Sequence, residues 1–138
     1  RGWRDEEIFQ TASEIRHKDD VVFTGYVSAE EKNALYQNAD VFAFPSLYEG
    51  FGIPPLEAMT FGCPVVCANA ASLPEVVGDA AELVDPLEVE SIANGIWGVL
   101  SDEAYAKSLT EKGLLQAKKY TWEASANRLM EICREIGK

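Results

Sequence analysis

Short apolar runs alternate with longer amphipathic stretches along this chain. The apolar runs are rich in Val and Phe and end near Gly, Pro or Asn, and they cover residues 21–27, 41–45, 64–69 and, more weakly, 81–86. Nearly continuous apolar runs indicate strands buried on both faces, as in a parallel sheet covered by helices. The pattern therefore predicts about four strands.

Helical spacing fills the intervals between these runs. Ser28 followed by Glu31 is the capping-box pattern of a helix start. Pro54 and Pro55 suit the first turn of another helix, which we expect to end at Phe61. Further helical stretches are predicted at 5–17, 73–78, 88–100, 102–119 and 122–136. The alternation of strand and helix predicts an α/β fold, a Rossmann-like doubly wound parallel sheet, in a single domain over residues 1–138.

Composition and charge narrow the choice of function. The chain has 138 residues, of which 47% are hydrophobic and 25% charged, as in soluble globular proteins. Its net charge of −11 disfavours nucleic acid as a partner. No apolar run is long enough to span a bilayer, and no secretion signal opens the chain.

Three cysteines without a CxxC pair favour a reduced protein in the cytoplasm. Cys63 and Cys67 flank the apolar residues Pro64–Val66, so we expect both to be buried free thiols rather than metal ligands or disulfide partners.

The segment 45–66, PSLYEGFGIPPLEAMTFGCPVV, carries the candidate chemistry. It follows a predicted strand, and ligands of doubly wound folds bind beyond the carboxyl ends of strands. Gly50 and Gly52 permit positive φ, which would let the N–H groups of residues 50–53 point one way and surround oxygens of a ligand. The helix start behind them adds about half a positive charge.

Two carboxylates flank this turn, and each has two interpretations. Glu57, expected in the first helical turn, would complement the helix dipole without any ligand, or would accept hydroxyls of a ribose cis-diol. Glu49 would simply be exposed in the loop, or would bind sugar hydroxyls and stabilise positive charge developing at a sugar carbon. The spacing alone leaves both acids open.

The longer string from Pro45 to Pro86 resembles the signature of the retaining family-4 (group 1) glycosyltransferases of the GT-B fold. Glu49 and Glu57 match the family's pattern of Glu, seven residues, Glu. The stretch FTGYVSAEEKNALYQNADVFAFPS resembles the family's upstream segment, and YTWEASANRLMEI resembles its closing helix. The resemblance runs from about Val21 to Ile132.

The resemblance implies a nucleotide-sugar donor, a UDP- or GDP-sugar, bound without a metal. It assigns the ribose to Glu57, the neighbourhood of the transferred sugar to Glu49, and the sugar hydroxyls and diphosphate to the amides of Gly50, Phe51, Gly52 and Ile53. The turn at Tyr26 and Val27 would lie near the base, although Tyr26 is equally consistent with an ordinary core or surface aromatic.

The chain also departs from the family. GT-B enzymes have two domains, and this sequence resembles part of the second, without the N-terminal acceptor domain and without the first two strands of its own sheet. An Arg and a Lys that neutralise the donor diphosphate in the family have no match here. Each charge-assisted contact contributes about 1.5–3 kcal/mol, so their loss would weaken donor binding more than about a hundredfold. We therefore expect the isolated chain to be inactive in catalysis.

Without its first two strands, the sheet would expose an edge at 41–45 and leave the strand at 21–27 without neighbours. We expect these strands to pair with each other, to swap in a dimer, or to dock on a separate piece. A non-catalytic nucleotide-sugar binding or interaction module and a sugar-nucleotide epimerase fragment are alternative functions. An NAD-dependent dehydrogenase is disfavoured, since no GxGxxG follows a first strand. Membrane association of the longer enzyme stays open.

Overall fold

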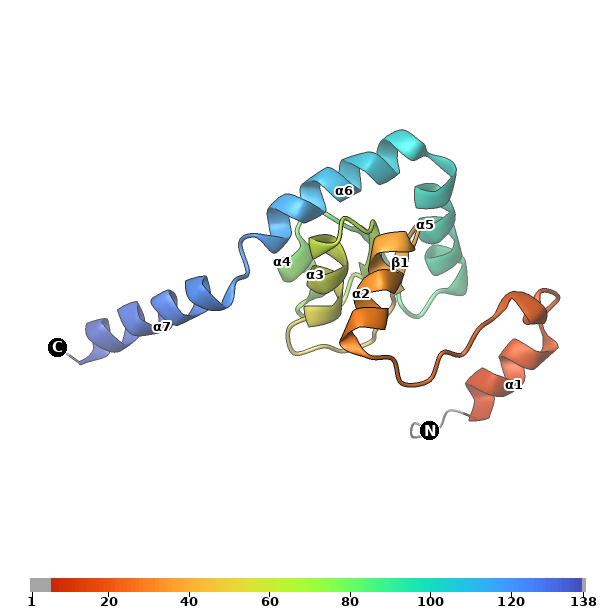
Figure 1. Ribbon diagram of the computed structural model, residues 1–138, viewed down its shortest axis with the longest axis horizontal. Coiled ribbons are helices and arrows are strands. Elements are labelled where there is room, and N and C mark those ends of the chain that lie inside the picture. Colours follow the sequence, from red (N-terminus) through yellow and green to blue (C-terminus); the bar gives the residue numbers. More distant parts are fainter. Residues whose placement is uncertain (1–5, 138) are drawn as a thin grey trace.

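A three-stranded parallel sheet lies at the centre of the computed structural model, which describes residues 6–137 (Figure 1). Its strands are β1 (Phe42–Phe44), β2 (Val65–Ala68) and β3 (Glu82–Val84), in the order β1-β2-β3. β2 pairs with both neighbours, with Phe42 of β1 opposite Val65. Three of the four predicted strands are thus confirmed, and every described pairing is parallel.

The helices follow the predicted stretches, with α3 starting and α5 ending one residue outside them. They are α1 (Glu6–Glu14), a 3-10 turn (Lys18–Asp20), α2 (Ala29–Asn38), α3 (Ile53–Thr60), α4 (Leu73–Val77), α5 (Val89–Ser101), α6 (Glu103–Ala117) and α7 (Trp122–Ile136). The capping box of α2 is confirmed, since the Ser28 side chain accepts from the Glu31 N–H while the Glu31 carboxylate accepts from the Ser28 N–H. Helices α1 and α7 project from the body at opposite ends (Figure 1).

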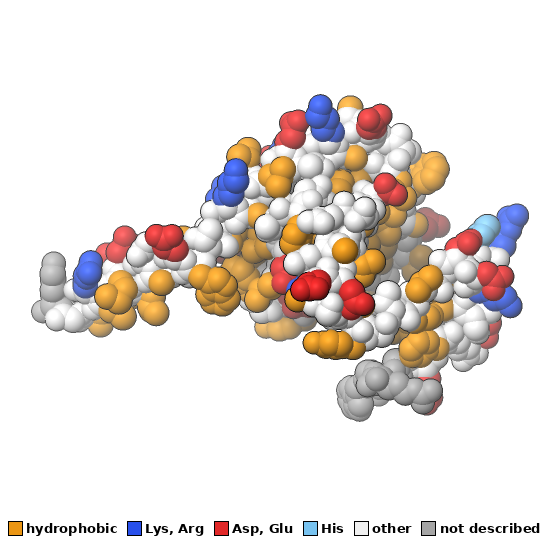
Figure 2. All heavy atoms as spheres, viewed as in Figure 1, with side chains coloured by type: hydrophobic (Ala, Val, Ile, Leu, Met, Phe, Trp, Pro, Cys, Tyr) orange, Lys and Arg blue, Asp and Glu red, His pale blue; other side chains and the backbone are white. Residues whose placement is uncertain are grey.

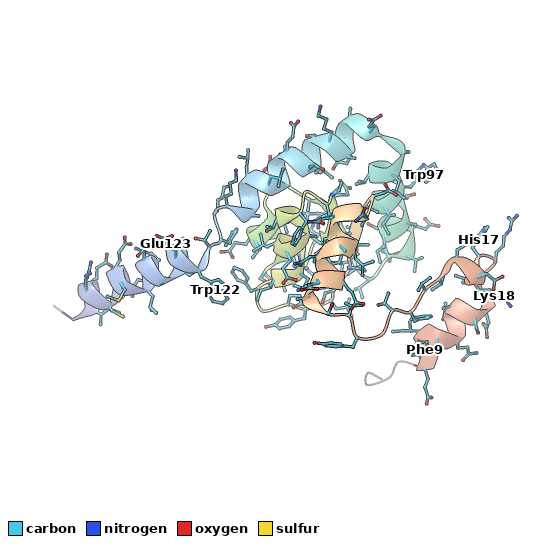
Figure 3. The ribbon with its side chains drawn as sticks, in the orientation of Figure 1. Phe9, His17, Lys18, Trp97, Trp122 and Glu123 are labelled. Carbon is cyan, nitrogen blue, oxygen red and sulfur yellow. The ribbon has the colours of Figure 1, made fainter. Side chains whose placement is uncertain are left out.

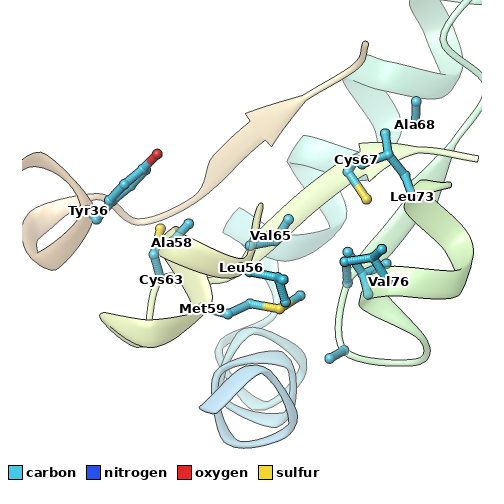
Figure 4. Packing of buried hydrophobic residues seen from close by; sticks show 13 residues of the cluster. Tyr36, Leu56, Ala58, Met59, Cys63, Val65, Cys67, Ala68, Leu73 and Val76 are labelled. Carbon is cyan, nitrogen blue, oxygen red and sulfur yellow. The ribbon is translucent and has the colours of Figure 1, made fainter. Parts of the chain in front are cut away.

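Helices cover both faces of the sheet. Side chains alternate along a strand, so Val65 and Cys67 of β2 face a core shared with α3 and α4, whose central members include Met59 and Leu73 (Figure 4). Val66 faces the other way, in a second cluster. That cluster joins β2 and β3 to α5 and α6: Val66, Val84, Val99 and Leu109. The doubly wound α/β architecture is confirmed.

The prediction of a strand at residues 21–27 is wrong. This segment follows the 3-10 turn as irregular extended chain, and Val22 and Tyr26 are 78% and 98% exposed. A strand needs backbone partners, and among residues 6–137 no strand lies beside this segment. The expected pairing with 41–45 is also wrong, because the only strand that pairs with β1 in the described part is β2. Swapping in a dimer and docking on a separate piece remain predictions.

Both predicted buried thiols are confirmed. Cys63 and Cys67 are free and buried, and burial raises the pKa of their thiols to about 11 and about 12. Cys133 is free and exposed on α7. Within residues 6–137, none of the helices is both long and apolar enough to cross a membrane.

Candidate functional site

The glycine-rich loop between β1 and α3 is shaped by one glycine rather than two. Gly52 caps α3 with φ of +109°, and a Cβ there would lie 2.6 Å from Cδ2 of the buried Leu73. Gly50 does not adopt positive φ, and a Cβ on it would meet nothing within 4 Å. The prediction of positive φ is therefore confirmed for Gly52 and wrong for Gly50.

Helix α3 begins one residue earlier than predicted, at Ile53, because Gly52 turns the chain into it. Pro54 and Pro55 occupy the first turn as expected. Glu57 is consequently the fifth residue of the helix and lies outside the first turn, so the prediction placing it there is wrong. The helix dipole acts mainly within the first turn, which weakens the purely structural explanation of this acid.

Residues 50–53 supply four consecutive backbone N–H groups at the start of α3. Among residues 6–137, no carbonyl or side chain accepts a hydrogen bond from the N–H groups of Gly50, Phe51, Gly52 or Ile53. These four donors precede the positive end of α3. Free N–H groups at such a position favour an anionic or hydroxyl-rich ligand.

Glu49 is half-buried and held in the loop by two serines. The hydroxyl of Ser46 donates to Oε1 of Glu49 at 2.9 Å, and within residues 6–137 no group donates to Oε2. The hydroxyl of Ser72, just before α4, lies 2.9 Å from the carbonyl oxygens of both Glu49 and Phe51. The carboxylate is thus fixed at the loop surface rather than freely exposed.

Glu57 pairs with a cation from a distant part of the chain. Nζ of Lys32 on α2 lies 2.7 Å from Oε1 of Glu57, and the two side chains are 38% and 36% exposed. Tyr36, one turn further along α2, is buried, and its pKa is raised first by that burial and next by the negative charge of Glu57. Helix α2 therefore presents two side chains to this carboxylate.

An apolar hollow of about 400 Å³ lies between the start of α3 and the connection from α6 to α7. Its lining combines the loop and α3 with the later segment: Phe51, Ile53, Leu56, Glu57, Thr60, Ala117, Tyr120, Thr121, Trp122 and Ser125. The rings of Phe51 and Tyr120 meet edge to face, with centroids 5.6 Å apart. Trp122 lies where α7 leaves the body (Figure 3), beside further apolar side chains along α7 (Figure 2).

The structure brings together most of the predicted site residues. Phe51, Ile53 and Glu57 share this hollow, and Glu49, Gly50 and Gly52 belong to the adjoining loop. Tyr26 and Val27 were predicted to lie near the nucleotide base. They line a separate hollow beside α2, together with Thr24 and Glu31.

Sequence reasoning missed Lys32, Ser72 and the aromatic wall formed by Tyr120. Lys32 stands 25 positions before its partner, and no local signal connects them. Ser72 belongs to a stretch that predicted only a short helix. For the aromatic wall, the only signal was the resemblance of 120–132 to a closing helix.

The chain matches the family model described as glycosyl transferases group 1 over residues 2–116. It is 45% identical over 123 residues to the O-antigen chain mannosyltransferase B of Escherichia coli. That match covers 89% of this chain and 32% of the relative. The chain therefore spans about a third of that curated relative.

Two solved structures share the fold. Sucrose-phosphate synthase from Thermosynechococcus elongatus aligns with a TM-score of 0.84 and 30% identity, over 94% of this chain and 33% of that one. The C-terminal domain of a glycosyl transferase group 1 family protein from Francisella tularensis aligns with a TM-score of 0.73 and 25% identity. This second match covers 86% of this chain and 64% of that domain.

Proposed function

This chain belongs to the group 1 glycosyl transferases, and we propose that it binds the nucleotide-sugar donor, a UDP- or GDP-sugar, of a retaining enzyme of that family. The observation that carries the proposal is the loop of residues 50–53, whose unpaired N–H groups lead into α3 and stand beside two positioned carboxylates. The transferred hexose is proposed to be mannose, from the similarity to a mannosyltransferase.

The loop amides have the chemistry to bind the diphosphate and sugar hydroxyls. With a net charge of −11, the chain repels a diphosphate at long range. Donors at Gly50, Phe51, Gly52 and Ile53, together with the start of α3, supply local positive potential that can overcome this repulsion. Binding by this loop needs no metal.

The two carboxylates have separate roles in this proposal. Glu57 accepts the ribose hydroxyls, at the rim of a hollow whose apolar walls limit water. Glu49 faces the transferred sugar, where its negative charge stabilises the positive charge that develops as the bond to the nucleotide breaks. A further domain of a longer protein must bind the acceptor substrate. The 138-residue chain alone is therefore expected to show no transfer activity.

Amide-resolved NMR of the chain, titrated with GDP, UDP and GDP-mannose, tests the donor site. We expect shifts centred on Gly50, Gly52, Ile53 and Glu57, and the tighter nucleotide identifies the base. Tyr26 and Val27 should shift with the nucleotide if their turn contacts the base.

Substitution of the acids separates specific binding from general charge effects. Glu57→Gln should weaken nucleotide binding about tenfold or more, because hydrogen bonds to a charged group contribute about 1.5–3 kcal/mol each. Glu75→Gln removes the same charge from an exposed acid on α4 and should leave binding unchanged. A folded chain whose spectrum ignores all three ligands would refute the proposal.

A further inference from the structure

The ion pair between Lys32 and Glu57 connects α2 to the candidate site across 25 positions of sequence. Both side chains are more than a third exposed, and pairs as exposed as this contribute little to stability. The consequence of the pair therefore lies in where it holds the Glu57 carboxylate rather than in how firmly it joins two helices.

Helix α2 is itself fixed well enough to act as a support. Its first turn is closed by the reciprocal capping box at Ser28. Its second half is anchored by Tyr36, whose ring packs edge to face on Phe42 of β1 with centroids 5.2 Å apart. Lys32 lies between these two anchors, so its position relative to the sheet is defined before any ligand arrives.

The pair leaves Glu57 able to bind a ligand. Lys32 contacts Oε1, while a carboxylate offers about four lone-pair positions on its two oxygens. A glutamate side chain that is already held loses less rotamer freedom when it accepts the hydroxyls of a diol. The ammonium also offsets the negative charge that Glu57 would otherwise present to an incoming anion.

We propose that Lys32 is a positioning residue, which orients the Glu57 carboxylate to accept a ribose cis-diol and balances its charge. This role rests on the proposed nucleotide-sugar site. It adds a residue from another helix to that site and predicts which part of the nucleotide depends on it: the ribose hydroxyls rather than the phosphates.

Three probes distinguish a positioning role from direct phosphate contact: GDP, 2′-deoxy-GDP and guanosine, or the uridine series if UDP binds more tightly. Lys32→Met removes the charge and keeps the aliphatic length, and Lys32→Arg restores the charge. Lys112→Met is the matched control. Lys112 also forms an ion pair between distant elements, 3.0 Å from Asp79, and removing it changes the net charge equally without touching Glu57.

The unsubstituted chain should bind GDP about tenfold or more tightly than 2′-deoxy-GDP, because the deoxy compound loses a hydrogen bond to a charged group. In Lys32→Met this ratio should fall to within about threefold, and Lys32→Arg should restore most of it. Lys112→Met should keep the full ratio. The Glu57 side-chain carboxyl resonance should also move in Lys32→Met without nucleotide, which shows that the pair exists in solution.

Two outcomes overturn the positioning role while leaving the proposed function in place. One is an unmoved Glu57 carboxyl resonance in Lys32→Met. The other is a Lys32→Met variant that loses much more affinity for GDP than for guanosine, while its ratio of GDP affinity to 2′-deoxy-GDP affinity is unchanged. This result would make Lys32 a phosphate ligand. If the folded, unsubstituted chain binds none of the three probes, the proposed function fails and this role fails with it.

Discussion

Replacing Gly52 by alanine should damage the fold and the site loop together. Gly52 combines a φ of +109° with a position where a new Cβ would lie 2.6 Å from Cδ2 of Leu73. Leu73 is fully buried, so its side chain has little room to move aside. Gly50, two residues earlier, has neither constraint. The pair Gly52→Ala and Gly50→Ala therefore compares one chemical change in two settings of the same loop.

The expected magnitude follows from three terms. Holding a non-glycine residue in a disfavoured backbone region costs about 1–3 kcal/mol, and inserting a methyl group into packed surroundings costs about 1–3 kcal/mol. Replacing glycine by alanine also lowers the conformational entropy of the unfolded chain, which stabilises the fold by about 0.4–1 kcal/mol. Gly52→Ala should therefore lower the free energy of unfolding by about 1–5.5 kcal/mol, whereas Gly50→Ala should leave it unchanged or raise it by up to about 1 kcal/mol.

Urea unfolding followed by far-UV circular dichroism measures both variants. Stability changes appear as shifts of the midpoint at constant slope. Because domains of this size are stable by only about 5–15 kcal/mol, the Gly52→Ala midpoint should move clearly. Equal midpoints for the two variants would refute the assignment of the left-handed turn and the Leu73 contact to Gly52.

Two further predictions concern the core. Gly95→Ala should lower the free energy of unfolding by about 1–3 kcal/mol, since its methyl would overlap Cγ1 of Val84. Gly98→Ala, in open space on the same helix, should raise it by up to about 1 kcal/mol, and equal urea midpoints would contradict this contrast. The pKa values of Cys63 and Cys67 are raised to about 11 and about 12. The unfolded thiols ionise first, near 9, so stability should fall as pH rises from about 9 towards 12; a level curve would contradict their burial.

Local patterns predicted the fold where burial or capping is decided by neighbours in sequence. The run at 64–69 is apolar up to its final Asn69, and its strand is buried on both faces. Ser28 and Glu31 cap α2 with their own side chains, so the spacing alone identified the helix start. The run at 21–27 has the same apolar character yet forms no strand, because strand formation depends on a partner that a local pattern cannot reveal.

The candidate site was predicted only in part for a similar reason. Two glycines look alike in sequence, and the structure distinguishes them by the positive φ of Gly52 and its contact with Leu73, 21 positions later. Glu57, a candidate from the sequence, was placed one residue too early in its helix. Its partner Lys32 lies on α2, for which the sequence predicted only a helix. The contact between α2 and α3 depends on the tertiary fold, which local patterns do not reveal.

Two separate parts of the string from Pro45 to Pro86 form one structural unit. In the sequence, EGFG and ASLP are separated by a helix and a strand. In the structure, the Ser72 hydroxyl lies 2.9 Å from the carbonyl oxygens of Glu49 and Phe51, and Leu73 fills the space beneath Gly52. The start of α4 thus supports the loop whose N–H groups make no hydrogen bond within residues 6–137. A loop that must keep four N–H groups unpaired needs its carbonyls satisfied and its backbone held from another element, and residues 72 and 73 do both.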